Sequence, residues 1–432
     1  MKRLSSPFAA ILLTLGSCLA LVSQTAQAAD GPAPALTLNE RVYVASRVYA
    51  SLDNFAHGQG VPNLDVDAAY RAYLDKAIAA QDRKAFSLAS MEFLAELKNS
   101  HTVFIDMALA QQGGVLPFIA QSVHGQWVVT ESMSPGLAAG DVIDKIDDRP
   151  FEQFVQEASR LISASTAEGA RHLLFARMTM VTPYAHLFPE QFVLTLAGGK
   201  KVAIDRRALH DVSLATEGRW LEPGKVAYIR IHSLLGPDFE KRALELAREY
   251  RQAQAIIVDV RGEPGGSTPG ELTSFLMDRP YAWWTESTPV EMPYFRFRAQ
   301  EGNPAYAPLD RPSLVWSSPV HPPAKDVFTG KLAILTDAGC YSACEDFVMP
   351  FKVTHRALIV GGTTGGSTGN AKMIDLGQGM MVMVGVKRAS FPDGSPFEGV
   401  GIQPDVEVDP SAEDLRAGKD TVLEAARQHL AQ

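Results

Sequence analysis

A serine lies where an apolar strand is predicted to give way to a helix. Lys331–Thr336 is short and apolar and predicts a buried strand, and residues 343–349 have helical character. Ser342 therefore lies at a helix start, beside backbone N–H groups that no helical carbonyl satisfies. Such a serine is either an ordinary N-cap or a nucleophile beside half of an oxyanion hole. Other residues of the chain favour the nucleophile.

A glycine-containing segment follows an earlier predicted core strand. Residues 255–260 form a continuous apolar run, and Arg-Gly-Glu-Pro-Gly-Gly-Ser follows at 261–267. Glycines at the carboxyl end of a parallel strand let the backbone turn sharply and approach a ligand. The segment lacks the Lys-Ser/Thr pair and the spacing of a phosphate or dinucleotide site. Gly265 or Gly266 can instead donate one N–H of an oxyanion hole, with Ala343 supplying the second.

These motifs together resemble the tail-specific (C-terminal-processing) peptidases. The resemblance rests on Asp-Val-Arg-Gly-Glu-Pro-Gly-Gly at 259–266, Ser-Ala-Cys-Glu at 342–345 and Val-Gly-Gly-Thr-Thr-Gly-Gly at 360–366. It implies an α/β core of the ClpP/crotonase type over residues 213–432. It also implies serine-type hydrolysis of peptides or proteins, without metal or cofactor.

The general base departs from the commonest pattern of these peptidases. Members with a Ser-Lys dyad carry a lysine at the position that Ser367 occupies here, and Lys372 and Lys387 do not fit the motif's register. A Ser-Lys peptidase therefore remains only an alternative. Without lysine, Ser342 needs another neighbouring base with a pKa near the working pH, which histidine provides.

The tricorn-like branch of the superfamily uses serine, histidine and glutamate, and this sequence is similar to it. Its histidine lies in a Ser-His-Thr stretch, present here as residues 100–102, and its glutamate precedes a stretch like 399–405. The resemblance implies that His101 is the base and that Glu398 orients it, as a carboxylate does in a catalytic triad. Ser100 is implied as an accessory hydroxyl.

Simpler interpretations of each residue remain open. His101 can cap a helix end, Glu398 can be a solvated acid of a loop, and Glu345 is expected to cap its own helix. His232, at the end of the strand-like run 228–232, is a competing base. A non-catalytic protein that binds apolar ligands or peptides on the same scaffold is the alternative function.

Two further regions are predicted before the core. Residues 29–112 read as a helical domain, with apolar residues at helical spacing and no alternating strand pattern before about residue 110. Residues 113–212 read as short strands and turns, and 134–146 resembles the glycine-bounded turn and strand of a PDZ domain. The resemblance implies that a loop binds a peptide carboxylate, although Pro117 removes one N–H donor. The loop residues are Gly114, Val115, Leu116 and Phe118.

The N-terminus and the composition limit location and partners. Residues 1–28 have the charged start, apolar stretch and small-residue cleavage site of a signal peptide, so export to a periplasm is expected. Lipoprotein anchoring at Cys18 is the less favoured alternative. The net charge of −9 argues against nucleic acid, and no membrane span is predicted beyond the signal peptide. Cys340 and Cys344 flank the serine, and spacing alone leaves their pairing open.

Overall fold

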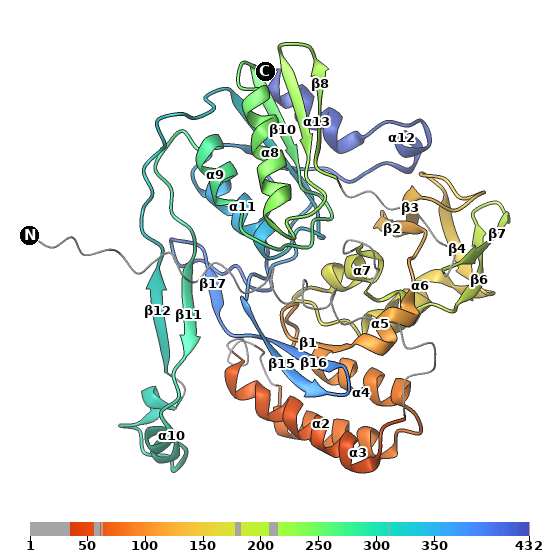
Figure 1. The fold of residues 1–432 in the computed structure, drawn as a ribbon, viewed down its shortest axis with the longest axis vertical. Coiled ribbons are helices and arrows are strands. Elements are labelled where there is room, and N and C mark those ends of the chain that lie inside the picture. The colour runs from red at the N-terminus through yellow and green to blue at the C-terminus, as the bar shows by residue number, and fades with distance from the viewer. Residues whose placement is uncertain are drawn as a thin grey trace, which may run out of the picture.

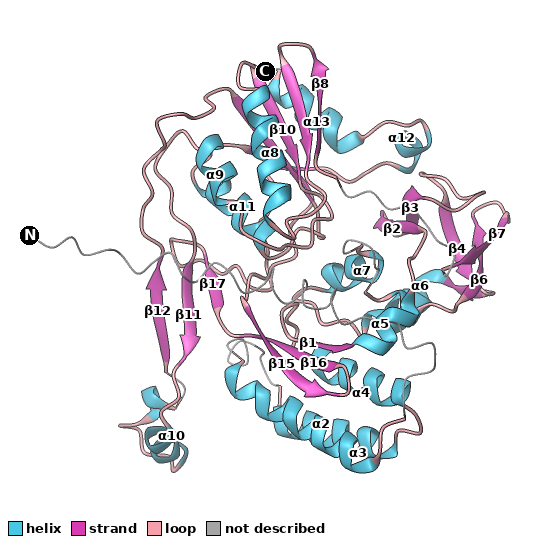
Figure 2. Cartoon of the chain, in the orientation of Figure 1, coloured by secondary structure: helices cyan, strands magenta, loops and turns pink. Residues whose placement is uncertain are grey.

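The computed structural model describes residues 35–55, 61, 64–177, 183–206, 215–310 and 312–431. The predicted signal peptide, with Cys18, lies outside them. The described chain is a mixed α/β protein in which a helical layer, a β-rich layer and an α/β core surround the centre (Figures 1 and 2). No helix of these residues combines the length and hydropathy that crossing a bilayer requires.

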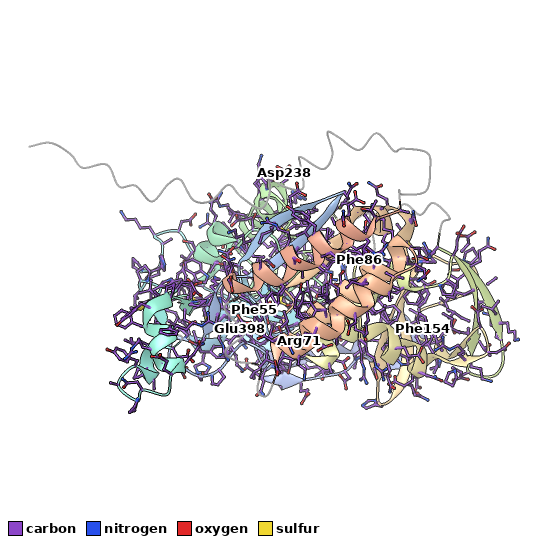
Figure 3. The ribbon with its side chains drawn as sticks, turned by 90° about the horizontal axis from the view of Figure 1, so that it is seen from below. Phe55, Arg71, Phe86, Phe154, Asp238 and Glu398 are labelled. Atoms are coloured by element: carbon purple, nitrogen blue, oxygen red, sulfur yellow. A yellow bond between two sulfur atoms is a disulfide. The ribbon has the colours of Figure 1, made fainter. Side chains whose placement is uncertain are left out.

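The N-terminal layer consists of capped helices. Its elements are α2 (Leu38–Ser51), η1 (Leu52–Asn54), α3 (Val66–Ala79) and α4 (Arg83–Ala95). Thr37 and Glu40 form a capping box on α2, and the side chains of Asp65 and Asp82 accept N–H groups at the starts of α3 and α4. Figure 3 looks onto this layer, with Phe86 of α4 labelled. These helices agree with the predicted helical domain.

A short strand that the sequence did not reveal follows the helices. The expectation of helix to about residue 110 is wrong, because β1 (Val103–Asp106) pairs antiparallel with β16 (Met380–Gly385), with β15 (Ala371–Gly377) beyond it. Four residues are too few to show a clear period-2 pattern. The pairing places His101, two residues before β1, beside a C-terminal sheet.

A buried ion pair fixes this junction. Arg83 donates from Nε and Nη2 to the two carboxylate oxygens of Asp106 at 2.9 and 2.8 Å, and Nη2 also donates to the Gln378 carbonyl at 2.6 Å. Ser87 Oγ donates to the same carboxylate at 2.7 Å. Both charged side chains are almost fully buried. Breaking one partner of such a pair leaves an uncompensated charge in the interior.

We predict that Asp106→Ala lowers the free energy of unfolding by about 3–5 kcal/mol, because the buried Arg83 loses its partner. Glu92→Ala, which breaks the exposed ion pair with Lys76, is the control and is expected to cost less than about 1 kcal/mol. Urea unfolding of both variants checks this. Equal losses would contradict the role given to the buried pair.

The β-rich layer is an antiparallel sheet in the order β2-β3-β4-β6-β7, with β5 paired to β4. Its strands are β2 (Phe118–Val123), β3 (Gln126–Ser132), β4 (Val142–Ile146), β5 (Arg149–Pro150), β6 (Gln191–Leu196) and β7 (Lys201–Asp205). Its helices are α5 (Met107–Gly113), α6 (Phe151–Ser159), α7 (Ala167–Phe175) and η3 (Ala185–Leu187). Packed aromatic rings, among them Phe118, Trp127 and Phe175, fill its interior.

The α/β core is a six-stranded sheet in the order β18-β14-β13-β10-β9-β8, parallel except for β8. Its strands are β8 (Glu217–Glu222), β9 (Val226–Arg230), β10 (Ala255–Asp259), β13 (Lys331–Thr336), β14 (Leu358–Gly361) and β18 (Val406–Glu407). Its helices are α8 (Pro237–Glu249), α9 (Gly270–Leu276), α11 (Ala343–Val353) and α13 (Thr421–Leu430), and α12 (Ala412–Arg416) precedes α13.

Helices cover both faces of this sheet. Ile256 and Val258 pack in one cluster with α8, α9 and α11, whereas Ile257 packs with α13. Burial on both faces explains why the strand sequence is continuously apolar rather than alternating. The predicted strands and helices of this region are confirmed.

A separate arm extends from the core (Figure 1). It comprises β11 (Thr285–Pro289), α10 (Pro293–Gln300), η4 (Ala307–Leu309) and β12 (Ser313–Ser317), and its base pairs with β17 (Arg388–Ser390). The arm includes much of residues 304–323, which the proline-rich sequence did not identify as structured.

Candidate active site

Ser342 lies in a strained turn between β13 and α11. Its backbone has φ 56° and ψ −118°, a region that residues with a side chain rarely adopt. Its side chain makes no capping hydrogen bond to α11. Ser342 therefore occupies the N-cap position of α11 without capping the helix through its side chain. The half-buried side chain lies at the start of the helix, where the Ala343 N–H has no carbonyl of the preceding turn to bond.

The turn after β10 lies against Ser342. Gly265 has φ 102°, and a Cβ placed on it would lie 2.7 Å from Ser342 Cβ and 3.4 Å from the Ala343 nitrogen. A side chain here would therefore both strain the backbone and collide with Ser342. A Cβ on Gly266 would lie 2.2 Å from the carbonyl oxygen of Leu234. Both positions require glycine, because neighbouring backbone lies too close to leave room for a Cβ atom.

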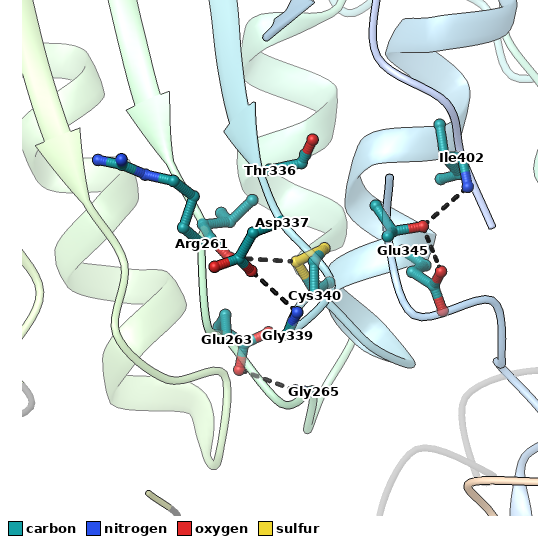
Figure 4. The surroundings of a disulfide bond; sticks show 12 residues. Arg261, Glu263, Gly265, Thr336, Asp337, Gly339, Cys340, Glu345 and Ile402 are labelled. Atoms are coloured by element: carbon teal, nitrogen blue, oxygen red, sulfur yellow. Dashed lines mark hydrogen bonds between the residues drawn. A yellow bond between two sulfur atoms is a disulfide. The ribbon is translucent and has the colours of Figure 1, made fainter. Parts of the chain in front are cut away.

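A buried carboxyl group shapes this turn. Glu263 Oε1 accepts the N–H groups of Leu234 and Gly265 at 2.9 and 3.0 Å (Figure 4). The Gly265 N–H, one of the predicted oxyanion donors, is thus already bonded. Burial raises the pKa of Glu263 to about 8, although the two N–H groups oppose the shift. The side chain is fully buried, so its protonated form is favoured over a wider pH range than that of an exposed glutamate.

This carboxyl makes stability depend on pH. Its pKa rises from 4.5 to about 8 on folding, so the folded chain retains a proton that the unfolded chain loses between these values. Stability from this group is full below about pH 4.5 and is lost as pH rises through about 8. We predict that Glu263→Gln keeps both accepted N–H bonds and reduces this fall, as urea unfolding across pH 5–9 would show.

Glu245→Gln on α8 is the matched control, because its carboxylate is 51% exposed. It should leave the pH dependence unchanged. A Glu263→Gln variant with the full wild-type pH dependence would show that Glu263 is ionised in the fold.

A disulfide brackets Ser342. Cys340 and Cys344 are bonded, with their Cα atoms 5.3 Å apart (Figure 4). The residues just before this disulfide are held by Asp337, whose Oδ1 accepts the N–H groups of Gly262 and Gly339 at 2.7 and 2.9 Å. The loop before the serine is therefore tied both to the first turn of α11 and to the turn after β10.

Residues 364–369, here called the bridge segment, follow β14 and are clamped by Glu345. The Oε1 atom of Glu345 accepts the Gly366 N–H at 2.7 Å and the Thr364 hydroxyl, and Oε2 accepts the Ser367 N–H at 2.9 Å. Burial raises the pKa of this carboxyl to about 8. Glu345 was expected to cap its own helix. That expectation is wrong, because these three bonds direct it at the bridge segment.

His101 reaches the bridge segment from the N-terminal layer. Its Nδ1 lies 2.9 Å from Ser367 Oγ, and the Gly369 N–H points to Nδ1 at 3.4 Å. The His101 N–H donates to Asn99 Oδ1 at 2.9 Å, which fixes the loop before β1. The ring is buried and contacts the bridge segment, so His101 does not cap an exposed helix end.

Ser367 connects the histidine to the serine. Its hydroxyl meets His101 Nδ1, while its carbonyl accepts the Ser342 N–H at 3.0 Å. His101 and Ser342, which lie far apart in the sequence, therefore both contact Ser367. In the sequence, Ser367 stands only at the position of a missing lysine. Nothing in its local sequence indicated this contact.

The charge environment of His101 comes from residues that the sequence did not single out. Burial lowers the pKa of His101 to about 4, and the charge of Lys387 lowers it further while that of Asp346 raises it. Asp346 is held by Trp284 Nε1 at 2.7 Å and Thr368 Oγ1 at 2.8 Å. The imidazole is therefore neutral over the range in which a general base must act.

Glu398 lies on the other side of the bridge segment. Its Oε1 accepts the Ala389 N–H at 3.2 Å, and the next residue, Gly399, donates its N–H to the Gly366 carbonyl at 2.9 Å. Burial raises the pKa of Glu398 to about 7, and hydrogen bonds with the backbone of Ala389 and Thr368 oppose this. The solvated-acid interpretation is wrong, since the side chain is only 6% exposed.

The remaining predicted residues lie around this centre. The Ser100 N–H lies 3.4 Å from Ser165 Oγ, and its hydroxyl has no hydrogen-bond partner within the described residues. His232 instead lines a cavity of about 730 Å³ between β2, α7 and the ends of β9 and β10. In the predicted carboxylate loop, the Val115 N–H donates to the Arg206 carbonyl at 3.1 Å.

Comparison with known proteins relates the α/β core to a family. Residues 225–408 match peptidase family S41, a span that includes the turn after β10, Ser342, the bridge segment and Glu398. The match covers most of the α/β core but less than half of the chain, so the core is similar to the S41 family of tail-specific peptidases. The match supports a serine-type peptidase. His101 lies before the matched span.

Solved structures share the fold. Mature CPAF complexed with lactacystin has 15% identity and a TM-score of 0.66, with 91% of this chain and 98% of that chain covered. The photosystem II D1 C-terminal processing protease has 18% identity and a TM-score of 0.50, with 91% and 97% covered. A search of curated proteins finds no significant match.

Proposed function

We propose that this chain is an exported S41 peptidase that cleaves peptide bonds through an acyl-enzyme on Ser342, with His101 as the general base. The supporting observation is that Ser367 bonds to Ser342 through its carbonyl and to His101 through its hydroxyl. The strained backbone of Ser342 and the lack of a capping bond leave its hydroxyl available for attack.

The proposed tautomer of His101 carries its proton on Nδ1. Nδ1–H then donates to Ser367 Oγ, the long contact with the Gly369 N–H at 3.4 Å is given up, and the lone pair on Nε2 takes the proton of Ser342. In this proposal the Ser342 oxygen bonds to the peptide carbonyl carbon while its proton moves to Nε2. The proton then passes to the leaving amine, and water opens the acyl-enzyme by the same route.

Glu398 and Ser100 support the base in this proposal. Glu398 bonds to the backbone of Thr368, the residue between the two groups that meet Nδ1, and so orients the ring through the bridge segment. Ser100 is the accessory hydroxyl next to the histidine. Asp346 adds a negative charge that favours the imidazolium as it forms.

The oxyanion hole is assigned to the Ala343 N–H, with the Gly266 N–H as the second donor. Ala343 opens α11, so its N–H also benefits from the positive end of the helix dipole. Gly265 was predicted as an alternative donor, but its N–H bonds to Glu263, and we assign it the role of allowing close approach.

The surrounding layers are assigned by the same resemblance. We take the parallel sheet as a ClpP/crotonase-like core and the β2–β7 sheet with α6 and α7 as a PDZ-like module. The loop with Gly114, Val115, Leu116 and Phe118 is proposed to bind a peptide carboxylate, and the positive φ of Gly114 supports a tight turn there. Export rests on residues 1–28.

We predict that Ser342→Ala abolishes hydrolysis and that His101→Ala lowers turnover by about 10³-fold or more, as triad members do. Ser367→Ala should lower it by about tenfold, the effect of one lost hydrogen bond. Steady-state cleavage of a peptide library, with folding followed by circular dichroism, checks these values.

His429→Ala, on the exposed side of α13, is the control and should be neutral. A fluorophosphonate probe should label the wild type and not Ser342→Ala. Near-normal turnover of His101→Ala would disprove the base assignment, and a folded wild type that resists the probe would favour the non-catalytic binding protein.

A pH prediction follows from the environment of the ring. A base must be deprotonated, so a pKa of about 4 keeps activity high as pH falls well below 6.5. Lys387→Met removes a positive charge that disfavours the imidazolium. The acid limb of kcat/KM should therefore move to higher pH. Lys372→Met is the control and should not move it. An unchanged limb for Lys387→Met would remove His101 as the titrating base.

A further inference from the structure

The arm, residues 285–317, exposes apolar side chains that the rest of the molecule does not cover. Figure 1 shows it projecting from the core beside β17. Of the fourteen large hydrophobic residues that are exposed in the described chain, six are in the arm. They are Val290 (39%), Tyr294 (64%), Phe297 (58%), Leu314 (59%), Val315 (62%) and Trp316 (38%). Soluble monomers rarely expose so many on one element without a partner.

The exposed area is comparable with what a dimer needs. These six side chains offer roughly 480 Å² of apolar surface, taking about 200 Å² for an aromatic and 100 Å² for an aliphatic side chain. A standard interface buries ~800 Å² on each partner, a little over half of it apolar. The arm can therefore supply most of the apolar part of a stable interface.

The strand β12 has an open edge, and the register with β11 shows which of its residues direct their backbone groups to that edge. It lies at the end of the sheet β12-β11-β17. The Val290 N–H donates to the Pro312 carbonyl at 2.9 Å and the Ser318 N–H to the Trp284 carbonyl at 3.1 Å. Backbone groups alternate in direction along a strand, so the N–H and C=O groups of Leu314 and Trp316 point toward β11. The N–H and C=O groups of Ser313, Val315 and Ser317 therefore point to the open edge.

This edge lacks the usual protection against pairing. Strand edges of monomeric proteins carry charges, prolines or bulges that prevent contact with another edge. The sequence of β12 is Ser-Leu-Val-Trp-Ser, with none of these, and all five residues are exposed. An uncharged and regular edge of this kind can accept another strand.

We propose that β12 pairs with β12 of a second copy of this chain, antiparallel and centred on Val315. A two-fold axis at Val315 places Ser313 of one copy opposite Ser317 of the other, so every outward N–H meets an outward carbonyl. Such an isologous contact is self-complementary and closes at two subunits.

The charges of the arm favour a protein partner over a membrane. Arg298 pairs with Glu301 at 2.6 Å and Arg296 with Glu291 at 3.9 Å. Each of these basic side chains is paired with an acidic one, so the described residues of the arm, 285–310 and 312–317, offer no unpaired basic side chain to anionic lipid. Pairing of two uncharged strands needs no such surface.

The paired arms would also support the active site. Glu286 of β11 forms an ion pair with Lys387, and the Thr288 hydroxyl donates to the Val386 carbonyl at 2.7 Å. The neighbouring Ala389 N–H bonds to Glu398. The second copy would therefore hold the strand that carries Lys387 and contacts Glu398.

Disulfide trapping tests the geometry. A hydrogen-bonded antiparallel pair places Cα atoms ~5.5 Å apart, within the ~4.4–6.8 Å of a disulfide. Val315→Cys in the full chain should therefore give a covalent dimer on mild oxidation. Leu38→Cys, equally an exposed apolar position, is the control and should not.

Sedimentation velocity tests the pairing itself. The wild type should sediment as a dimer, and Val315→Pro should weaken association at least tenfold, because proline removes an outward N–H and leaves the bonds to β11. Leu38→Asp, at the start of α2, controls for loss of an exposed apolar residue.

Three results would overturn the proposal: a wild type that is monomeric at all concentrations, a dimer that persists in Val315→Pro, or no covalent dimer from Val315→Cys. Wild-type binding to anionic lipid vesicles that Val315→Pro abolishes, with both proteins monomeric, would assign the arm to membranes instead. These measurements need no hydrolysis, so they stand or fall apart from the proposed activity.

Discussion

The hydrogen bonds of Glu345 are the constraint on which the candidate site depends. Its carboxyl accepts three donors of the bridge segment, at Thr364, Gly366 and Ser367. Ser342 directly precedes the helix that carries Glu345. Because this one helix both presents the serine and fixes the segment that meets His101, the distance between the proposed nucleophile and base is set by backbone and carboxyl contacts rather than by flexible side chains.

The proposed base, His101, lies outside the span that matches the S41 family. The loop with His101 is held by Asn99, by the β1–β16 pairing and, further along, by the buried Arg83–Asp106 pair. In this proposal the α/β core supplies the nucleophile and the carboxyls, and the N-terminal layer supplies the imidazole. The proposal therefore links the stability of that layer to the activity.

The sequence was sufficient for the parts of the site that motifs define. Ser342 at a helix start, the turn with Gly265 and the strands of the core all follow from local patterns. The roles of Ser367, Asp346 and Lys387 required the three-dimensional structure, since each acts through a residue distant in sequence. The four-residue β1 was missed because its pairing with β16, rather than its own pattern, makes it a strand. The Cys340–Cys344 bond also needed coordinates, because spacing does not fix Cα separation.

A crystal structure of the fluorophosphonate adduct would show whether Ser342 and His101 act together as nucleophile and base. We expect phosphorus on Ser342 Oγ, a phosphoryl oxygen at the Ala343 N–H, and His101 Nε2 within ~3 Å of Oγ while Nδ1 remains at Ser367. An adduct in which another imidazole lies beside Ser342, or in which the His101 ring is turned away from it, would show that His101 is not the base.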